Sequence, residues 1–212
     1  MDNITIGIVA RDEKIGKTTY QVVSQNILKY LDNKCNYIGL ITHSKDYIDK
    51  ELLEICDGII IQGGSEISPY HYQIVNHCIK TKTPLLGICM GHQILGLYSN
   101  TKDELSLINV QNHNSENITH NINITPGTIL HRLFGSNLTT NTRHNYALET
   151  VTKPFKVIAK SDDNVIEALE YTANGNYLLG VQWHPEDMNN MDNIFIDFTR
   201  AALLNKTNKN LS

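Results

Sequence analysis

The chain has 212 residues, 41% of them hydrophobic and 19% charged, and its 22 acidic and 18 basic side chains give a formal net charge of −4. A chain of this length buries enough apolar surface to fold without disulfides or a structural metal. The acidic balance argues against a protein that binds nucleic acid or a membrane surface, since both need a basic patch. No apolar run approaches the roughly 20 residues of a membrane helix, and Met1-Asp2-Asn3 does not resemble a secretion signal. We therefore expect a cytoplasmic protein with one domain over residues 1–212, a core at about 4–204 and a frayed polar tail at 205–212.

The first half of the sequence alternates strand and helix patterns. Short apolar runs typical of buried strands occur at 4–10, 37–42, 58–62 and 84–89. Amphipathic patterns predict helices over about 18–31, 47–56 (with Leu52, Leu53 and Ile55 turned inward), 69–81 and from about Gly91 onward. This alternation predicts an α/β fold, in which helices cover both faces of a mostly parallel sheet and the functional site lies at the carboxyl ends of the strands.

The second half is richer in strand patterns. We expect these strands at 118–124, 156–159, 165–171 and 177–183, followed by a closing helix over about 191–204. The polar stretch 109–117 is expected to be a mobile loop. No repeat or linker divides the chain, which supports a single domain.

The segment Gly87-Ile88-Cys89-Met90-Gly91 places a cysteine between two glycines at the end of a predicted strand. This is the pattern of a nucleophile elbow, a tight turn that exposes the nucleophile and points the next N–H, that of Met90, at a carbonyl under attack. Glycines leave room for the strained backbone and for the following helix. The start of that helix favours a thiolate over a thiol. Cys89 is therefore the candidate nucleophile, with a structural buried cysteine as the alternative.

Two further segments follow predicted strands. In Val181-Gln182-Trp183-His184-Pro185-Glu186, an extended backbone would place His184 and Glu186 on one face, where the carboxylate can orient the imidazole as a base. Gly63-Gly64-Ser65 leaves backbone N–H groups unobstructed, which suits a second oxyanion donor. Either segment could be a simple surface turn. All three together, at the carboxyl ends of parallel strands, favour acyl transfer by a cysteine.

With these residues in view, the chain resembles the class I glutamine amidotransferase superfamily, whose triad is Cys–His–Glu in that order. Residues 84–93 match the nucleophile segment and 182–186 match the His-Pro-Glu segment. Residues 63–72 resemble the G-G-S-x-x-x-P-x-x-Y loop of the γ-glutamyl-γ-aminobutyrate hydrolase branch (peptidase C26-like). Other features shared with that branch are His120, Pro126-Gly127, Leu130 and Val165-Ile166-Glu167-Ala168. The resemblance spans about residues 4–200.

The resemblance implies a flavodoxin-like fold and a hydrolase that cleaves the γ-glutamyl amide bond of a small γ-glutamyl compound. Cys89 would form a γ-glutamyl thioester, His184 and Glu186 would complete the triad, and Gly64 and Met90 would form the oxyanion hole. No metal or other cofactor is implied. Residues that match the substrate-binding segments are Gly63, Ser65, Gln93, Asn141, Thr142, Arg143 and His144.

The chain also departs from the hydrolase branch. Gln62 stands where that branch usually has proline, residues 141–146 keep one histidine of a double-histidine segment, and Gly91-His92-Gln93 is closer to glutaminase subunits. Two alternatives therefore stand beside the hydrolase: a glutaminase subunit that delivers ammonia to a synthetase partner, and a non-catalytic regulatory relative. The sequence leaves a homodimer open and does not name the amine released.

Cysteine and histidine spacing does not predict a metal site. The remaining cysteines, Cys35, Cys56 and Cys78, have neither zinc nor disulfide spacing and are expected to serve packing. His71 and His77 are too far apart for a helical zinc pair. Surface or packing positions are expected for His43, His77, His113 and His131.

Overall fold

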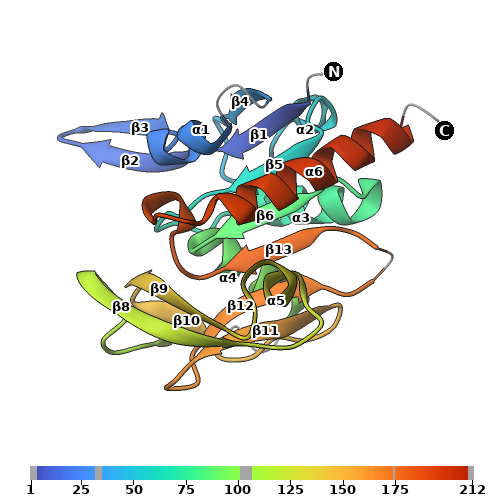
Figure 1. Cartoon of the computed structure of the whole chain (residues 1–212). Coiled ribbons are helices and arrows are strands. Elements are labelled where there is room, and N and C mark those ends of the chain that lie inside the picture. Colours follow the sequence, from blue (N-terminus) through green and yellow to red (C-terminus); the bar gives the residue numbers. More distant parts are fainter. Residues whose placement is uncertain (1–3, 32–34, 101–106, 174, 210–212) are drawn as a thin grey trace.

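The computed structural model describes residues 4–31, 35–100, 107–173 and 175–209, and it is built around one nine-stranded sheet. Figure 1 shows that this sheet has two halves. The parallel half consists, in spatial order, of β4 (Asn36–Leu40), β1 (Thr5–Val9), β5 (Gly58–Ile61), β6 (Leu85–Ile88) and β13 (Leu178–Val181). The antiparallel half continues through β12 (Ile166–Tyr171), β11 (Phe155–Ser161), β8 (Asn114–Ile124) and β9 (Asn137–Arg143).

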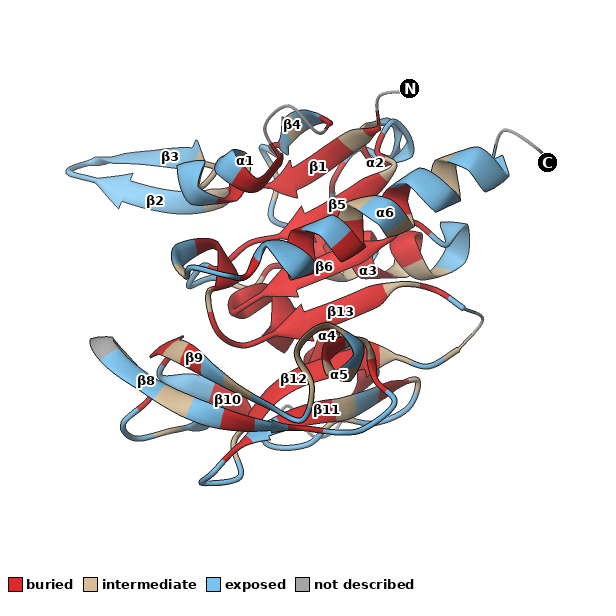
Figure 2. Cartoon of the chain, viewed as in Figure 1, coloured by how far each residue is buried: buried red, intermediate tan, exposed pale blue. Residues whose placement is uncertain are grey.

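Helices cover both faces of the sheet, as the strand–helix alternation predicts. The helices that pack against one face are α1 (Gln25–Leu31), α5 (Ile129–Phe134) and α6 (Asp192–Lys209). The helices that pack against the other face are α2 (Lys50–Glu54), α3 (Pro69–Thr81) and α4 (Met90–Ser99). Apart from the edge strand β4, which is mostly exposed, the parallel strands are therefore buried on both sides (Figure 2). Burial on both sides explains why they are continuous apolar runs. None of the described helices is both long and apolar enough to cross a membrane.

The first predicted helix is wrong in its first part. Residues Arg11–Ile15 and Thr18–Val22 form a β-hairpin, β2 and β3, and α1 begins only at Gln25. A two-residue turn closes this hairpin, with Gly16 at a φ of 64°, a conformation that glycine adopts without a steric penalty. The spacing after Thr18 resembled a helix cap, but tertiary pairing with β2 decided the conformation.

Two further expectations, on Ile55 and on the stretch 109–117, need correction. Ile55 is 57% exposed, because α2 ends at Glu54 before a turn could bring Ile55 to the core. The stretch 109–117 is not one mobile loop, because β7 (Leu107–Asn109) pairs with β10 (Tyr146–Leu148) and β8 already begins at Asn114.

The polar tail is also more ordered than expected, because α6 continues to Lys209. Lys206 Nζ lies 3.3 Å from Asp57 Oδ2, and Lys209 Nζ lies 3.4 Å from Thr83 Oγ1. These contacts tie the last helical turns to the amino ends of the parallel strands. Residues 210–212 lie outside the described residues.

Candidate active site

Cys89 stands on a strained turn between β6 and α4. Its φ is 50° and its ψ is −101°, an unusual conformation for a residue with a side chain. A Cβ on Gly87 would lie 2.6 Å from the carbonyl carbon of Gly91, and a Cβ on Gly91 would lie 2.2 Å from the carbonyl oxygen of Ile61. The glycines on either side are therefore required by close backbone approach, as a nucleophile elbow predicts.

His184 reaches Cys89 because β13 lies directly beside β6. Val181 pairs with Ile88, and the backbone N–H of Cys89 donates to the carbonyl of Val181 at 2.8 Å. Residues that follow β13 consequently lie next to residues that follow β6. The sequence separates Cys89 and His184 widely, and the parallel pairing brings them together.

Glu186 contacts His184 through a different geometry from the expected one. The two were expected to share a face of an extended segment, but Pro185–Asp187 forms a 3-10 turn. His184 Nδ1 and Glu186 Oε1 are 2.7 Å apart, and the Glu186 side chain is 3% exposed. The contact is the expected one, although a turn and not an extended strand produces it.

The electrostatic surroundings of His184 favour its protonated form. Burial by itself would lower the pKa of His184, but hydrogen bonds to the Cys89 side chain and to Glu186 raise this pKa to about 9. A protonated imidazole stabilises a neighbouring thiolate. The arrangement thus suits a thiolate–imidazolium pair oriented by a carboxylate.

The glycines after β5 pack directly on this pair. A Cβ on Gly63 would lie 2.6 Å from His184 Cε1 and 3.5 Å from Cys89 Cβ. A Cβ on Gly64 would lie 2.9 Å from Met90 Cε. Both glycines therefore adjoin the elbow, as expected for a loop beside it. The use of the Gly64 and Met90 N–H groups as oxyanion donors stays a prediction.

A cavity of about 380 Å³ opens in front of Cys89. Most of the residues expected to bind substrate line it. The predicted site residues among its walls are Gly64, Ser65, Cys89, Met90, Gln93, Arg143 and His144.

Three predicted substrate-binding residues do not line the cavity: Gly63 packs against the His184 ring, and Asn141 and Thr142 are engaged elsewhere. The Asn141 amide donates to the His184 carbonyl at 2.9 Å and accepts from the His184 N–H at 2.9 Å. The Thr142 hydroxyl is buried and donates to the carbonyl of His113 at 2.8 Å. Asn141 is therefore placed to hold the His184 backbone, and Thr142 to anchor β9.

Two glutamines complete the surroundings of the cysteine. Gln182 Nε2 lies 3.6 Å from Cys89 Sγ, and Gln93 Nε2 donates to Gln182 Oε1 at 3.2 Å and to the Tyr146 carbonyl at 2.8 Å. Sequence reasoning did not select Gln182. Its position two residues before His184 at the end of a buried strand was the available signal.

Gln62, the departure from the hydrolase branch, has a structural explanation. Its amide donates to the carbonyls of Val9 and Val22 at 2.9 and 2.8 Å and accepts from the N–H of Ser24 at 3.0 Å. A proline could not form these bonds, which connect β5 to the hairpin strand β3 and to the start of α1.

Comparison with known proteins agrees with this geometry. Residues 70–186, more than half of the chain, match the family Peptidase C26. A glutamine-hydrolyzing GMP synthase subunit of Sulfurisphaera tokodaii is 31% identical over 166 residues, which cover 71% of this chain and 78% of that protein. Gamma-glutamyl-gamma-aminobutyrate hydrolase PuuD of Escherichia coli is 25% identical over 224 residues, which cover 88% of this chain and 87% of that protein.

The fold is shared with solved structures. The glutaminase domain of Trypanosoma brucei CTPS, solved with bound acivicin, superposes with a TM-score of 0.73 at 15% identity and covers 95% of this chain and 94% of that one. The mostly parallel sheet with flanking helices is thus the class I glutamine amidotransferase fold, and the chain is a member of the Peptidase C26 family of glutamine amidotransferase-like hydrolases.

Proposed function

We propose that this protein hydrolyses the γ-glutamyl amide bond of a small γ-glutamyl compound and releases glutamate and an amine. The observation that carries the proposal is the contact of Cys89 with His184, whose other ring nitrogen lies 2.7 Å from Glu186. Cys89 also faces a cavity of about 380 Å³, large enough for a glutamyl group. The name of the PuuD relative supports the same class of substrate.

The reaction begins when the Cys89 thiolate attacks the γ-amide carbonyl carbon. A carbon–sulfur bond forms, and the carbonyl oxygen becomes an oxyanion held by the N–H groups of Gly64 and Met90. Losing one such donor costs about 3 kcal/mol of transition-state stabilisation. The imidazolium of His184 then donates its proton to the departing nitrogen, and the carbon–nitrogen bond breaks.

Water completes the cycle. His184, now neutral, removes a proton from a water molecule that attacks the γ-glutamyl thioester. The carbon–sulfur bond breaks, glutamate leaves, and Cys89 returns as a thiolate beside protonated His184. Glu186 keeps the imidazole in one tautomer throughout both steps.

Arg143 is the candidate ligand for the α-carboxylate of the glutamyl group. It lines the cavity and pairs with Asp187, while its Nε is buried and has no hydrogen-bond partner in the described part of the chain. Charge-assisted bonds from arginine to a carboxylate are strong and directional. Gln93 and His144 lie on the same cavity wall, where both bond to the Tyr146 carbonyl and so shape this end of the binding site.

The test is a panel of γ-glutamyl amides with different amines, assayed for glutamate release, with free glutamine included. Wild type should release glutamate from at least one of them, and Cys89→Ala should reduce turnover at least about 10⁴-fold. Cys78→Ala is the matched control, because Cys78 is a buried thiol on α3 that packs in the hydrophobic core and does not line the cavity. Turnover by Cys89→Ala at the wild-type rate would end the proposal.

The glutaminase subunit is the second candidate, and the 31% identity to a GMP synthase subunit favours it. Such a protein would act on free glutamine and pass ammonia to a synthetase. The same panel separates the two. Hydrolysis of substituted γ-glutamyl amides by the isolated chain supports the hydrolase. Turnover of glutamine alone, increased by a synthetase partner, supports the glutaminase.

A further inference from the structure

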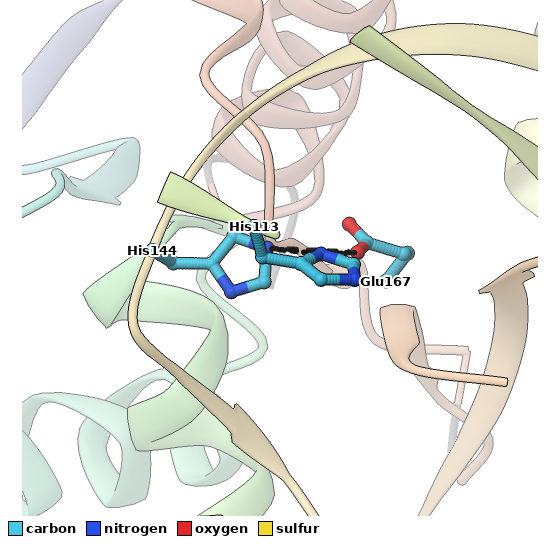
Figure 3. A group of neighbouring side chains, drawn as sticks. All are labelled: His113, His144 and Glu167. Atoms are coloured by element: carbon cyan, nitrogen blue, oxygen red, sulfur yellow. Dashed lines mark hydrogen bonds and ion pairs between the residues drawn. The ribbon is translucent and has the colours of Figure 1, made fainter. Parts of the chain in front are cut away.

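A second group of titratable side chains lies in the antiparallel half of the sheet, outside the proposed reaction. His113, His144 and Glu167 come from the segment before β8, the residue after β9, and β12 (Figure 3). Their side chains are 3%, 2% and 0% exposed, respectively. The buried carboxylate of Glu167 forms no hydrogen bond of good geometry among the described residues, and three histidine nitrogens lie at ion-pair distance, 3.3 to 3.6 Å from its Oε1. A buried carboxylate with no such hydrogen bond requires a compensating positive charge.

The separations of the three facing atoms suit a metal ion. His113 Nδ1 lies 3.3 Å from His144 Nε2, and Glu167 Oε1 lies 3.5 Å from the first and 3.6 Å from the second. Ligands at zinc bond lengths of about 2.0–2.1 Å in a tetrahedron are about 3.3–3.4 Å from one another. The three atoms thus form a triangle close to one face of a zinc tetrahedron.

The outer ring nitrogens supply independent support. His113 Nε2 lies 3.0 Å from Asp163 Oδ2, and His144 Nδ1 lies 3.1 Å from the Tyr146 carbonyl oxygen. Both outer partners are acceptors, so each ring donates its outer N–H. In neutral rings the two facing nitrogens then carry lone pairs directed at each other and at the carboxylate. Metal-binding histidines show this arrangement, in which a carboxylate or a carbonyl fixes the tautomer.

We propose that His113 Nδ1, His144 Nε2 and Glu167 Oε1 bind one zinc ion. Two imidazoles and a carboxylate suit zinc better than calcium or magnesium, which prefer oxygen ligands. His120 Nε2 lies 3.3 Å from Glu167 Oε1 but is not among the ligand atoms that lie within 4.8 Å of one another, so the fourth position of the tetrahedron would be taken by water. The proposal departs from the expectation that the chain needs no metal and that His113 serves surface or packing.

The ion would act structurally, because the ligands are buried. It would join the start of β8, the end of β9 and β12, which are distant in the sequence. His144 also lines the cavity before Cys89, and the Tyr146 carbonyl that accepts from His144 accepts from Gln93 as well. Zinc would therefore stabilise the wall that holds Arg143 and His144.

The test is zinc binding by the full chain carrying Cys89→Ala, because a reactive thiolate near His184 would be a competing zinc ligand. After removal of metal with a chelator, calorimetric titration with Zn²⁺ alone should show one ion per chain. Zinc should raise the melting temperature, since it binds only the folded state. Adding Glu167→Gln should weaken zinc binding at least about 100-fold, and His131→Gln, outside the cluster, should leave it unchanged.

Two results would overturn the proposal. One is the absence of stoichiometric zinc binding to the Cys89→Ala chain, which would mean that protons alone compensate Glu167. The other is equal affinity with and without Glu167→Gln. Should Glu167→Gln not fold, Co²⁺ added to the Cys89→Ala chain decides the matter. An intense tetrahedral visible spectrum supports the site, and the weak spectrum of hydrated Co²⁺ refutes it.

Discussion

Each half of the sheet buries an imidazole beside a carboxylate, yet the two groupings have different third partners. In the parallel half, His184 lies between Glu186 and the Cys89 side chain. In the antiparallel half, His113 and His144 face one another across Glu167. Both groupings adjoin the cavity of about 380 Å³, the first through Cys89 and the second through His144, but the side chains of His113, His144 and Glu167 are only 3%, 2% and 0% exposed.

The difference shows that an imidazole–carboxylate pair does not determine its own function. Beside a nucleophile on a strained turn, the pair can move protons and activate sulfur. Beside a second imidazole, when the outer nitrogen of each ring already donates a hydrogen bond, the inner ring nitrogens and the carboxylate direct their lone pairs at one point. That arrangement suits a cation. The following substitutions separate these roles.

The largest effect is expected from removing the charge of the carboxylate in the parallel half. Glu186→Gln should lower kcat on the order of 10³-fold, because the amide no longer stabilises imidazolium or holds one tautomer. Stability should change little, as the side chain keeps its volume. Initial rates on the best γ-glutamyl amide measure the loss. Glu54→Gln, which removes an exposed carboxylate paired with Lys50, should leave the rate within about twofold. A kcat for Glu186→Gln near that of the control would remove Glu186 from the proposed triad.

A smaller loss should follow from displacing the imidazole. Gly63→Ala adds a Cβ that would lie 2.6 Å from His184 Cε1, so the ring must move. Misplacing a catalytic group by about 1 Å can cost roughly 10²-fold in rate. Gly39→Ala is the control, because its Cβ would meet Val23 at an ordinary 3.6 Å. Steady-state kinetics on both variants test whether the close contact matters, and equal rates would show that it does not.

Substrate affinity should be affected more weakly. Arg143→Gln removes the guanidinium from the cavity wall and should raise KM about 10-fold with kcat nearly unchanged, since the bond to the α-carboxylate exists before and during the reaction. Arg132→Gln carries the same charge change but pairs with Asp197 between α5 and α6, away from the cavity. An unchanged KM in Arg143→Gln would mean that another group binds the carboxylate.

The smallest effect concerns stability against pH. The pKa of His184 is about 9 in the folded chain, above its ordinary 6.5, so the folded state holds the proton more tightly than the unfolded state. The stabilisation is therefore complete below about pH 6.5 and is lost as pH rises through about 9. The loss should be below about 3 kcal/mol. Urea unfolding of wild type and His184→Gln across this range measures it. A stability difference that grows with pH would contradict the raised pKa.

Local pattern predicted the parallel half well. Pro69–Thr81 forms a helix over the predicted residues, and β1, β5 and β6 lie within the predicted apolar runs. These strands are buried on both faces, so nearly every residue in them is apolar and the sequence shows a continuous apolar run. The antiparallel half was predicted less completely. Strand β9 (Asn137–Arg143) is polar and lies at the sheet edge, where neither alternation nor an apolar run marks it.

The hairpin and the His–Glu cluster could not be predicted from local pattern. Thr18–Val22 forms a strand because it pairs with Arg11–Ile15. Most of its residues are exposed, so the sequence has no alternation of apolar and polar residues that would predict a strand there. His113, His144 and Glu167 lack the short spacing of a sequence motif. They come together only because three strands and their ends converge.

The candidate nucleophile and the parallel half of the sheet can be predicted from the amino-acid sequence without a structure. The tight turn requires glycines on both sides of Cys89, and strands buried on both faces must be apolar. Both requirements act on consecutive residues, so a short stretch of sequence is enough to predict them. Three contacts could be found only in the folded chain: Asn141 holds the His184 backbone, Glu186 reaches the imidazole through a turn, and Glu167 is enclosed by histidines. These contacts join residues through strand pairing and packing across the fold, which local sequence patterns do not encode.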